Sequence, residues 1–181
     1  MPVDTRLTYD DFCLLPDDGK RYEIIEGELF VTPAPRIPHQ IVVSQLTAEL
    51  LAFAKKKRMG RVLVGPVDVV FSEFDVVEPD IVYISKQRAS LLTEKNLQGA
   101  PDLAIEVLSE STEKRDRTTK LELYGKFGVQ EYWIIDPYGP SADIYRRGEK
   151  GLTLAAKLSA ADSLNSPLLP GFSVPLNTLT E

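Results

Sequence analysis

The chain has 181 residues, a mass of 20.2 kDa, 43 % apolar residues and 27 % charged residues. At ~100–200 residues per domain, this length predicts a single domain over residues 1–181, and the composition excludes a disordered or collagen-like chain. The net charge of −6 argues against a tight, non-specific binder of nucleic acid. It leaves a nuclease open, because a nuclease needs positive charge only around its site.

Cys13 is the single cysteine and His39 the single histidine. This excludes an internal disulfide, a cysteine-based zinc cluster and a multi-histidine metal site. A bound metal would take mostly carboxylate and backbone oxygens as ligands, a set that suits Mg²⁺ or Mn²⁺. No apolar run approaches ~18–20 residues, and the N-terminus lacks the apolar core of a signal peptide. We therefore expect no membrane span and a cytoplasmic protein.

The first predicted elements are a short helix and a β-hairpin. Thr8 is expected to cap the helix, because acidic residues follow it in the first turn. Residues 21–25 and 28–32 alternate polar and apolar side chains around Glu26-Gly27. This pattern predicts two strands joined by a two-residue turn.

A long helix is predicted over Ile37–Arg58, where apolar residues recur at helical spacing. Lysines fill its last turn, and Gly60 stands just beyond, as at a helix C-terminus. After it we predict strands over 61–64, 67–71, 79–84, 102–108, 131–136, 142–147, 152–158 and 172–174, and helices over 86–95 and 112–127. The residues after 162 should otherwise form mostly loop. This order predicts an α/β or α+β protein with a central mixed β-sheet flanked by helices.

Two carboxylates stand out within apolar strands. Asp80 begins the strand 79–84 and shares a face with Val82 and Ile84, unless it is simply a solvent-exposed acid at the strand start. Glu106 shares a face of the strand 102–108 with Ala104 and Leu108 and with Asp102. Glutamate is almost never fully buried without a partner. A functional Glu106 is therefore favoured over the alternative, an exposed residue on an edge strand.

The helix predicted over 112–127 carries Asp116, Lys120 and Tyr124 on one stripe, at i, i+4 spacing. Alone, this pattern also fits a solvated face with an Asp116–Lys120 ion pair. Together with two carboxylates on adjacent strands it fits phosphodiester hydrolysis. Carboxylates hold hard divalent ions, and a lysine can orient or deprotonate the attacking water and offset the charge on the phosphate.

Asp80 followed by Glu106 resembles the acidic pair of the PD-(D/E)XK restriction-endonuclease-like superfamily. The chain as a whole looks like the Uma-two family of proposed endonucleases in that superfamily. The matching stretches, in order, are 22–29, 65–70, 77–81, 100–103 with 106–109, and 120–133. The resemblance runs from about residue 8 to residue 176.

The resemblance implies a restriction-endonuclease-like core, a Mg²⁺ or Mn²⁺ cofactor and DNA as the substrate. It implies that Asp80, Glu106 and Lys120 are catalytic, and that Asp80, Glu106 and the backbone carbonyl of Val107 bind the metal. The superfamily's lysine usually follows the glutamate by two residues, where this chain has Leu108. Lys120 matches the lysine that the Uma-two family is thought to carry on the following helix.

Other cations on that helix, Lys114, Arg115 and Arg117, could serve in place of Lys120. We interpret His39 as a polar residue at a helix start. Ser109 and Ser111 lack the context of a nucleophile elbow, no glycine-rich phosphate loop is present, and Tyr132 and Trp133 should pack in the core.

A homodimer is expected, because a duplex has two strands to cut. The alternative function is a catalytically silent module of the same fold that binds nucleic acid or a protein partner.

Overall fold

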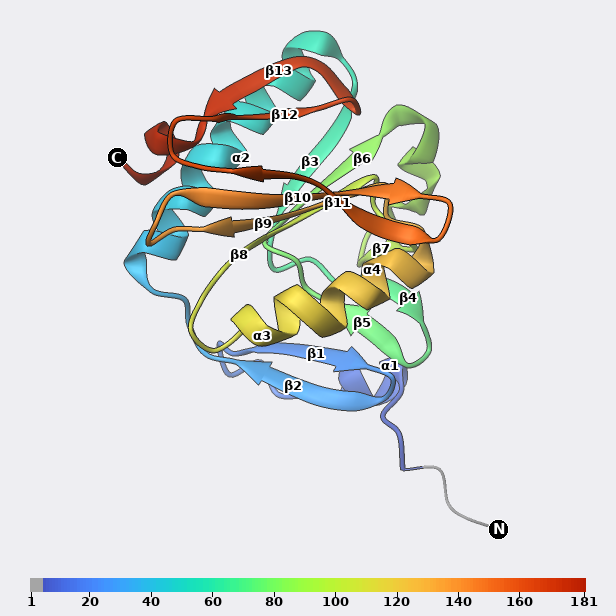
Figure 1. The fold of residues 1–181 in the computed structure, drawn as a ribbon. Coiled ribbons are helices and arrows are strands. Elements are labelled where there is room, and N and C mark those ends of the chain that lie inside the picture. Colours follow the sequence, from blue (N-terminus) through green and yellow to red (C-terminus); the bar gives the residue numbers. More distant parts are fainter. Residues whose placement is uncertain (1–4) are drawn as a thin grey trace.

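The central layer of the fold is a six-stranded mixed sheet with the order β11-β10-β9-β8-β6-β3 (Figure 1). The structure, a computed structural model, describes residues 5–181. β8 and β9 run parallel, whereas the other neighbouring pairs run antiparallel. The predicted central mixed sheet is therefore confirmed. Its strands are β3 (Gly60–Val64), β6 (Ile81–Ser85), β8 (Leu103–Val107), β9 (Glu131–Asp136), β10 (Ser141–Gly148) and β11 (Gly151–Leu158).

A second, five-stranded sheet has the order β2-β1-β5-β4-β7. The predicted hairpin forms its edge, and Glu26 and Gly27 both have positive φ, at 54° and 82°, as a type I′ turn requires. Pairing across long sequence distances joins the rest, such as Ile24 opposite Val76. The strands are β1 (Arg21–Ile25), β2 (Glu28–Thr32), β4 (Val69–Ser72), β5 (Asp75–Val77) and β7 (Leu97–Gln98).

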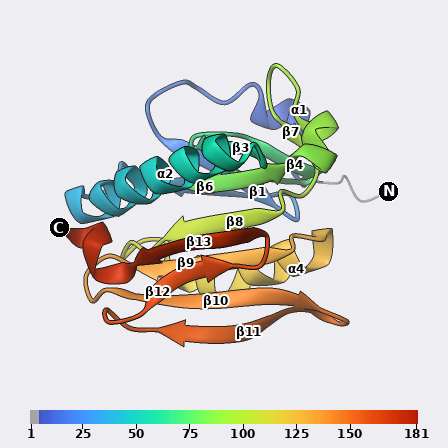
Figure 2. The same ribbon diagram turned by 90° about the horizontal axis from the view of Figure 1, so that it is seen from above.

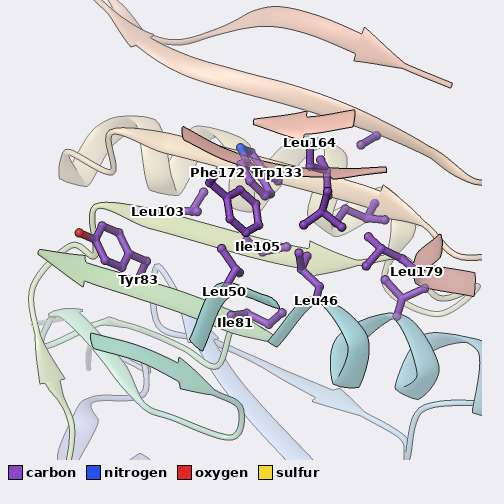
Figure 3. Packing of buried hydrophobic residues seen from close by; sticks show 14 of the residues in the cluster. Leu46, Leu50, Ile81, Tyr83, Leu103, Ile105, Trp133, Leu164, Phe172 and Leu179 are labelled. Carbon is purple, nitrogen blue, oxygen red and sulfur yellow. The ribbon is translucent and has the colours of Figure 1, made fainter. Parts of the chain in front are cut away.

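The two faces of the central sheet are covered by different elements. α2 (Ile37–Lys57) and the hairpin of β12 (Ser163–Ser166) and β13 (Leu169–Pro175) cover one face (Figure 2). Leu103 and Ile105 of β8 point into that layer beside Trp133 and Leu50 (Figure 3).

Ala104 of β8 packs on the opposite face, against α4 (Leu121–Phe127) and the second sheet, together with Val82 and Ile84 of β6. This alternation agrees with the predicted face of Asp80 and Glu106.

The end of α2 differs from the prediction. The left-handed residue that ends the helix is Arg58, with φ 53°, and Gly60 already belongs to β3. Gly60 is needed for another reason, since a Cβ there would lie 2.2 Å from the carbonyl oxygen of Ile84. A close approach of two strands, rather than a helix cap, requires this glycine.

The helix predicted over 112–127 contains an unexpected π-helical turn. It runs as α3 (Glu113–Arg115), the π-helical turn η2 (Asp116–Lys120) and α4, and ends at Gly128 with φ 96°. Such turns inside helices are frequent at functional sites. Here the turn carries Asp116 and Lys120, both of which are buried.

Three smaller segments complete the fold. Thr8 caps α1 (Tyr9–Phe12) in a reciprocal capping box with Asp11, as predicted for the cap. The predicted helix over 86–95 is wrong beyond the 3₁₀ turn η1 (Lys86–Leu91), because Leu92 already pairs with Leu97 as a β-bridge. The tail is more regular than predicted, since β12 and β13 pair with each other and the 3₁₀ turn η3 (Leu176–Thr180) follows.

Among residues 5–181, no helix is both long enough and apolar enough to span a membrane.

Candidate active site

The residues singled out from the sequence meet in one cavity of about 150 Å³. It lies on the face of the central sheet that β1 and the helix α3–η2–α4 cover, beside the first turn of α2. Asp80, Glu106, Val107 and Lys120 all line it. The acids come from the start of β6 and from β8. Ile81 is opposite Ile105 in the antiparallel register. Asp80 precedes Ile81 and Glu106 follows Ile105, so the two acids are neighbours across the strands.

Asp80 stands immediately before β6 and is buried. Its Oδ1 accepts a hydrogen bond from Arg21 at 2.7 Å, and its Oδ2 accepts one from the backbone N–H of Val107 at 2.8 Å. His39 Nε2 lies 3.1 Å from Oδ2. Burial favours the neutral acid, but the hydrogen bond with His39 and the charge of Arg21 lower the pKa of Asp80 to about 2. Asp80 is thus an ionised, buried acid, and the solvent-exposed alternative is wrong.

Glu106 is 3 % exposed and lies in a central strand, so the edge-strand alternative is wrong. Its Oε1 accepts hydrogen bonds from Lys120 Nζ and from the Tyr124 hydroxyl, both at 2.8 Å. Within residues 5–181, no protein group donates a hydrogen bond to its Oε2. Burial raises the pKa of Glu106 to about 8, although the charge of Lys120 acts in the opposite direction.

Lys120 is buried among three carboxylates. Its Nζ lies 2.7 Å from Glu23 Oε1, 2.8 Å from Glu106 Oε1 and 3.7 Å from Asp116 Oδ1. Burial favours the neutral amine, but Glu106 and Glu23 raise the pKa of Lys120 well above its usual value. The Asp116–Lys120 ion pair is present. Both side chains are buried, so the alternative interpretation, which placed the pair on a solvated helix face, is wrong.

Glu23 and Arg21 belong to the site, although the sequence did not point to them. Both are on β1, and Glu23 Oε1 also accepts a hydrogen bond from the backbone N–H of Glu78 at 2.9 Å. Arg115 lies 3.3 Å from Glu23 Oε2. In the sequence, the polar positions of an alternating hairpin look solvent-facing. Only the docking of β1 against the central sheet buries them.

His39 lies in the first turn of α2, as predicted, but it is only 5 % exposed and contacts Asp80, which the sequence did not indicate. Its Nδ1 is buried without a hydrogen-bond partner among the described residues. The signal in the sequence was its position in the first turn of a helix, directly after Ile37 and Pro38. Periodicity alone could not show that this turn abuts Asp80.

The other cations of the helix are placed differently from Lys120. Arg115 lines the cavity, whereas Lys114 is exposed and Arg117 pairs with Glu113 and Asp143 outside it. Among the candidates, Lys120 alone contacts Glu106.

Tyr132 and Trp133 are buried in the core, as predicted, and Ser109 and Ser111 bond to each other on the cavity wall.

The donor set fits a hard divalent cation. Asp80 is ionised, and Glu106 Oε2 has no hydrogen-bond donor among residues 5–181. The negative charges of Asp116, Asp80 and Glu23 act on Glu106, and a bound cation would offset them. Among the described residues, no three His, Cys, Asp or Glu side chains form a preassembled metal cluster. Mg²⁺ does not need one, because it commonly binds through one or two carboxylates and completes its shell with water and substrate phosphate.

The mixed sheet, with Asp80 and Glu106 side by side and Lys120 on the helix packed against them, is the arrangement that the resemblance to restriction-endonuclease-like proteins led us to expect. The chain belongs to the Uma2 family, described as "Putative restriction endonuclease", whose model matches residues 9–178.

Among solved structures, a protein from Anabaena variabilis described as "a putative nuclease belonging to DUF820" has the same fold. The TM-score is 0.80 at 22 % identity, over 96 % of this chain and 97 % of that one. No curated protein matches this chain.

Proposed function

We propose that the protein is a metal-dependent endonuclease that hydrolyses phosphodiester bonds, with DNA as the substrate. The observation that carries the proposal is the contact of Lys120 Nζ with Glu106, 2.8 Å long, in the cavity that Asp80 also lines. The family of the chain supports the nuclease class.

The lining of the cavity favours chemistry on the nucleic-acid backbone. Asp80 and Glu106 lie there beside Lys120 and Arg21. Acids that can hold a divalent cation, next to fixed positive charges, suit a phosphodiester and its attacking water.

Asp80, Glu106 and the backbone carbonyl of Val107 are the groups that would hold Mg²⁺ or Mn²⁺. When bound, such an ion lowers the pKa of a ligated water and offsets charge on the phosphate. Arg21 and His39 serve this arrangement by keeping Asp80 ionised and fixing both of its oxygens.

Lys120 acts as a fixed positive charge in this proposal. Its raised pKa keeps the amine protonated at neutral pH, so it cannot accept a proton from water. It orients the attacking water or donates a hydrogen bond to the phosphate, where charge accumulates in the transition state. Of the three roles considered for the lysine, orientation of the water and charge compensation are favoured over deprotonation of the water.

The test is incubation of the purified protein with linear, supercoiled and single-stranded DNA in the presence of Mg²⁺ or Mn²⁺, followed by addition of EDTA. We expect cleavage that EDTA abolishes and metal binding detectable by calorimetry. No cleavage of any substrate together with no metal binding would favour the catalytically silent module instead.

A further inference from the structure

Two exposed side chains that line the cavity form an ion pair across its mouth. Arg36 lies between β2 and α2, and Glu110 lies between β8 and α3, two segments that run side by side in Figure 1. The guanidinium donates two hydrogen bonds, NH1 to Oε1 at 3.1 Å and NH2 to Oε2 at 3.0 Å. The side chains are 65 % and 74 % exposed. The pair therefore bridges the cavity on its water-facing side.

Arg36 differs from the other arginines and the lysine that line the cavity. Arg21, Arg115 and Lys120 are all held by buried carboxylates, whereas the partner of Arg36 is exposed. An exposed ion pair contributes little to stability, so another anion can replace Glu110. A phosphodiester matches the fork of a guanidinium in the same bidentate way as a carboxylate.

Hydrogen bonds hold the chain segments on both sides of the mouth. We therefore expect the Arg36–Glu110 pair to separate by rotation of its side chains alone. Arg115 donates a hydrogen bond of 2.7 Å to Thr32 Oγ1, at the start of the segment that carries Arg36. On the other side, the hydroxyls of Ser109 and Thr112 lie 2.9 Å apart, and the Thr112 N–H donates to the Ser109 carbonyl.

We propose that Arg36 is a substrate-binding residue that contacts a backbone phosphate of the nucleic acid, and that Glu110 competes with this phosphate for Arg36. The inference rests on the proposed function and deepens it. Without substrate, Glu110 occupies the guanidinium of Arg36. A bound phosphate takes its place and opens the way to Asp80, Glu106 and Lys120.

The experiment measures the affinity of a short DNA duplex by fluorescence anisotropy in EDTA, over a range of salt concentrations. The proteins are the wild type, Arg36→Gln, Glu110→Gln and the double variant. The matched control is Glu113→Gln, which removes the same charge three residues further on and outside the cavity lining.

We expect Arg36→Gln to weaken binding about 10-fold and to reduce the slope of log affinity against log salt by about one. Glu110→Gln should tighten binding by up to about 5-fold, and the control should leave it nearly unchanged. The double variant should bind like Arg36→Gln, because Glu110 acts only through Arg36.

The proposal is wrong if Glu110→Gln tightens binding as much without Arg36 as with it, or no more than the control does. It is also wrong if Arg36→Gln binds DNA like the wild type, a result that leaves the nuclease function standing when the wild type cleaves. A wild type that neither binds nor cleaves DNA overturns both the proposed function and this inference.

Discussion

Lys120 contacts more than one buried acid, which gives it a structural role besides the role proposed for it in catalysis. Glu23 and Glu106 each lie within 2.8 Å of its amine, and Asp116 lies 3.7 Å away, all of them buried. Removing one partner of a buried charge pair leaves the other charge uncompensated in a poorly polarisable surrounding.

We therefore predict that Lys120→Met lowers the free energy of unfolding by about 3–5 kcal/mol. Adding Glu23→Gln removes one uncompensated charge and should restore part of that loss without restoring cleavage. Urea denaturation followed by circular dichroism measures the first effect, and a cleavage assay the second. Lys114→Met, at an exposed position of the same helix, is the control. Equal stability of Lys120→Met and wild type would contradict the proposed charge balance.

Glu106→Gln separates chemistry from folding more sharply. The amide oxygen can still accept hydrogen bonds from Lys120 and Tyr124, so we expect the free energy of unfolding to change by less than about 2 kcal/mol. Cleavage should fall more than about 100-fold. This exceeds the loss that is typical when only a hydrogen-bond partner of a metal ligand is removed. The exposed Glu122→Gln should cleave like wild type. Retained cleavage by Glu106→Gln would remove Glu106 from the reaction.

At the scale of elements, the π-helical turn places a titrating acid in the interior. Burial raises the pKa of Asp116 above its usual value, although Lys120 and Thr112 act in the opposite direction, and Glu23 and Asp80 add to the increase. The folded state therefore binds this proton more tightly than the unfolded state does. Its contribution to stability is complete below pH ~3.8 and is lost as pH rises through the folded pKa.

From this sign we predict that Asp116→Asn loses less stability than wild type as pH rises from 4 to 7. Urea unfolding at several pH values measures the difference between the two proteins. Asp10→Asn, at an exposed position in α1, should follow the wild type throughout. The quantity to follow is the free energy of unfolding of Asp116→Asn minus that of wild type, which should rise with pH. If it stays constant or falls, Asp116 is ionised in the folded protein at all these pH values.

Local sequence patterns predicted the elements whose conformation depends on residues that are neighbours in the chain. The hairpin at Glu26-Gly27 and the helix α2 follow from turn chemistry and periodicity, and strand alternation placed Asp80 and Glu106 on one face. The second sheet depends on pairings such as Ile24 with Val76, which no local pattern contains. For the same reason Glu23 was missed, since its burial arises only when β1 docks on the central sheet.

At the scale of the whole molecule, the charge balance predicts dependence on an added cation. The cavity lining has five carboxylates against four arginine and lysine side chains, and the chain carries a net charge of −6. A polyanion should therefore bind better once a divalent ion is present. We expect Mg²⁺ or Ca²⁺ to increase the affinity of the wild type for DNA, as measured by anisotropy, and Glu106→Gln to lose most of this increase. An affinity that divalent ions do not change would argue against a metal in the site.

The assembly is a separate prediction. We expect a homodimer, because cutting both strands of a duplex calls for two sites. Light scattering should then give a mass of about 40 kDa, twice the chain mass of 20.2 kDa. A mass near that of one chain at micromolar concentration, with or without DNA, would reject the dimer.

The position of Trp133 makes its fluorescence insensitive to ligand binding at the site. It is the single tryptophan of the chain, fully buried, with its ring 6.4 Å from that of Phe172. Trp133 lies beside Ile105 on the face of the sheet turned away from Glu106 (Figure 3). Its emission should be blue-shifted, stay constant when Mg²⁺ or DNA is added, and move to longer wavelength only on unfolding. Intrinsic fluorescence can therefore report folding in every variant described above without interference from ligand binding.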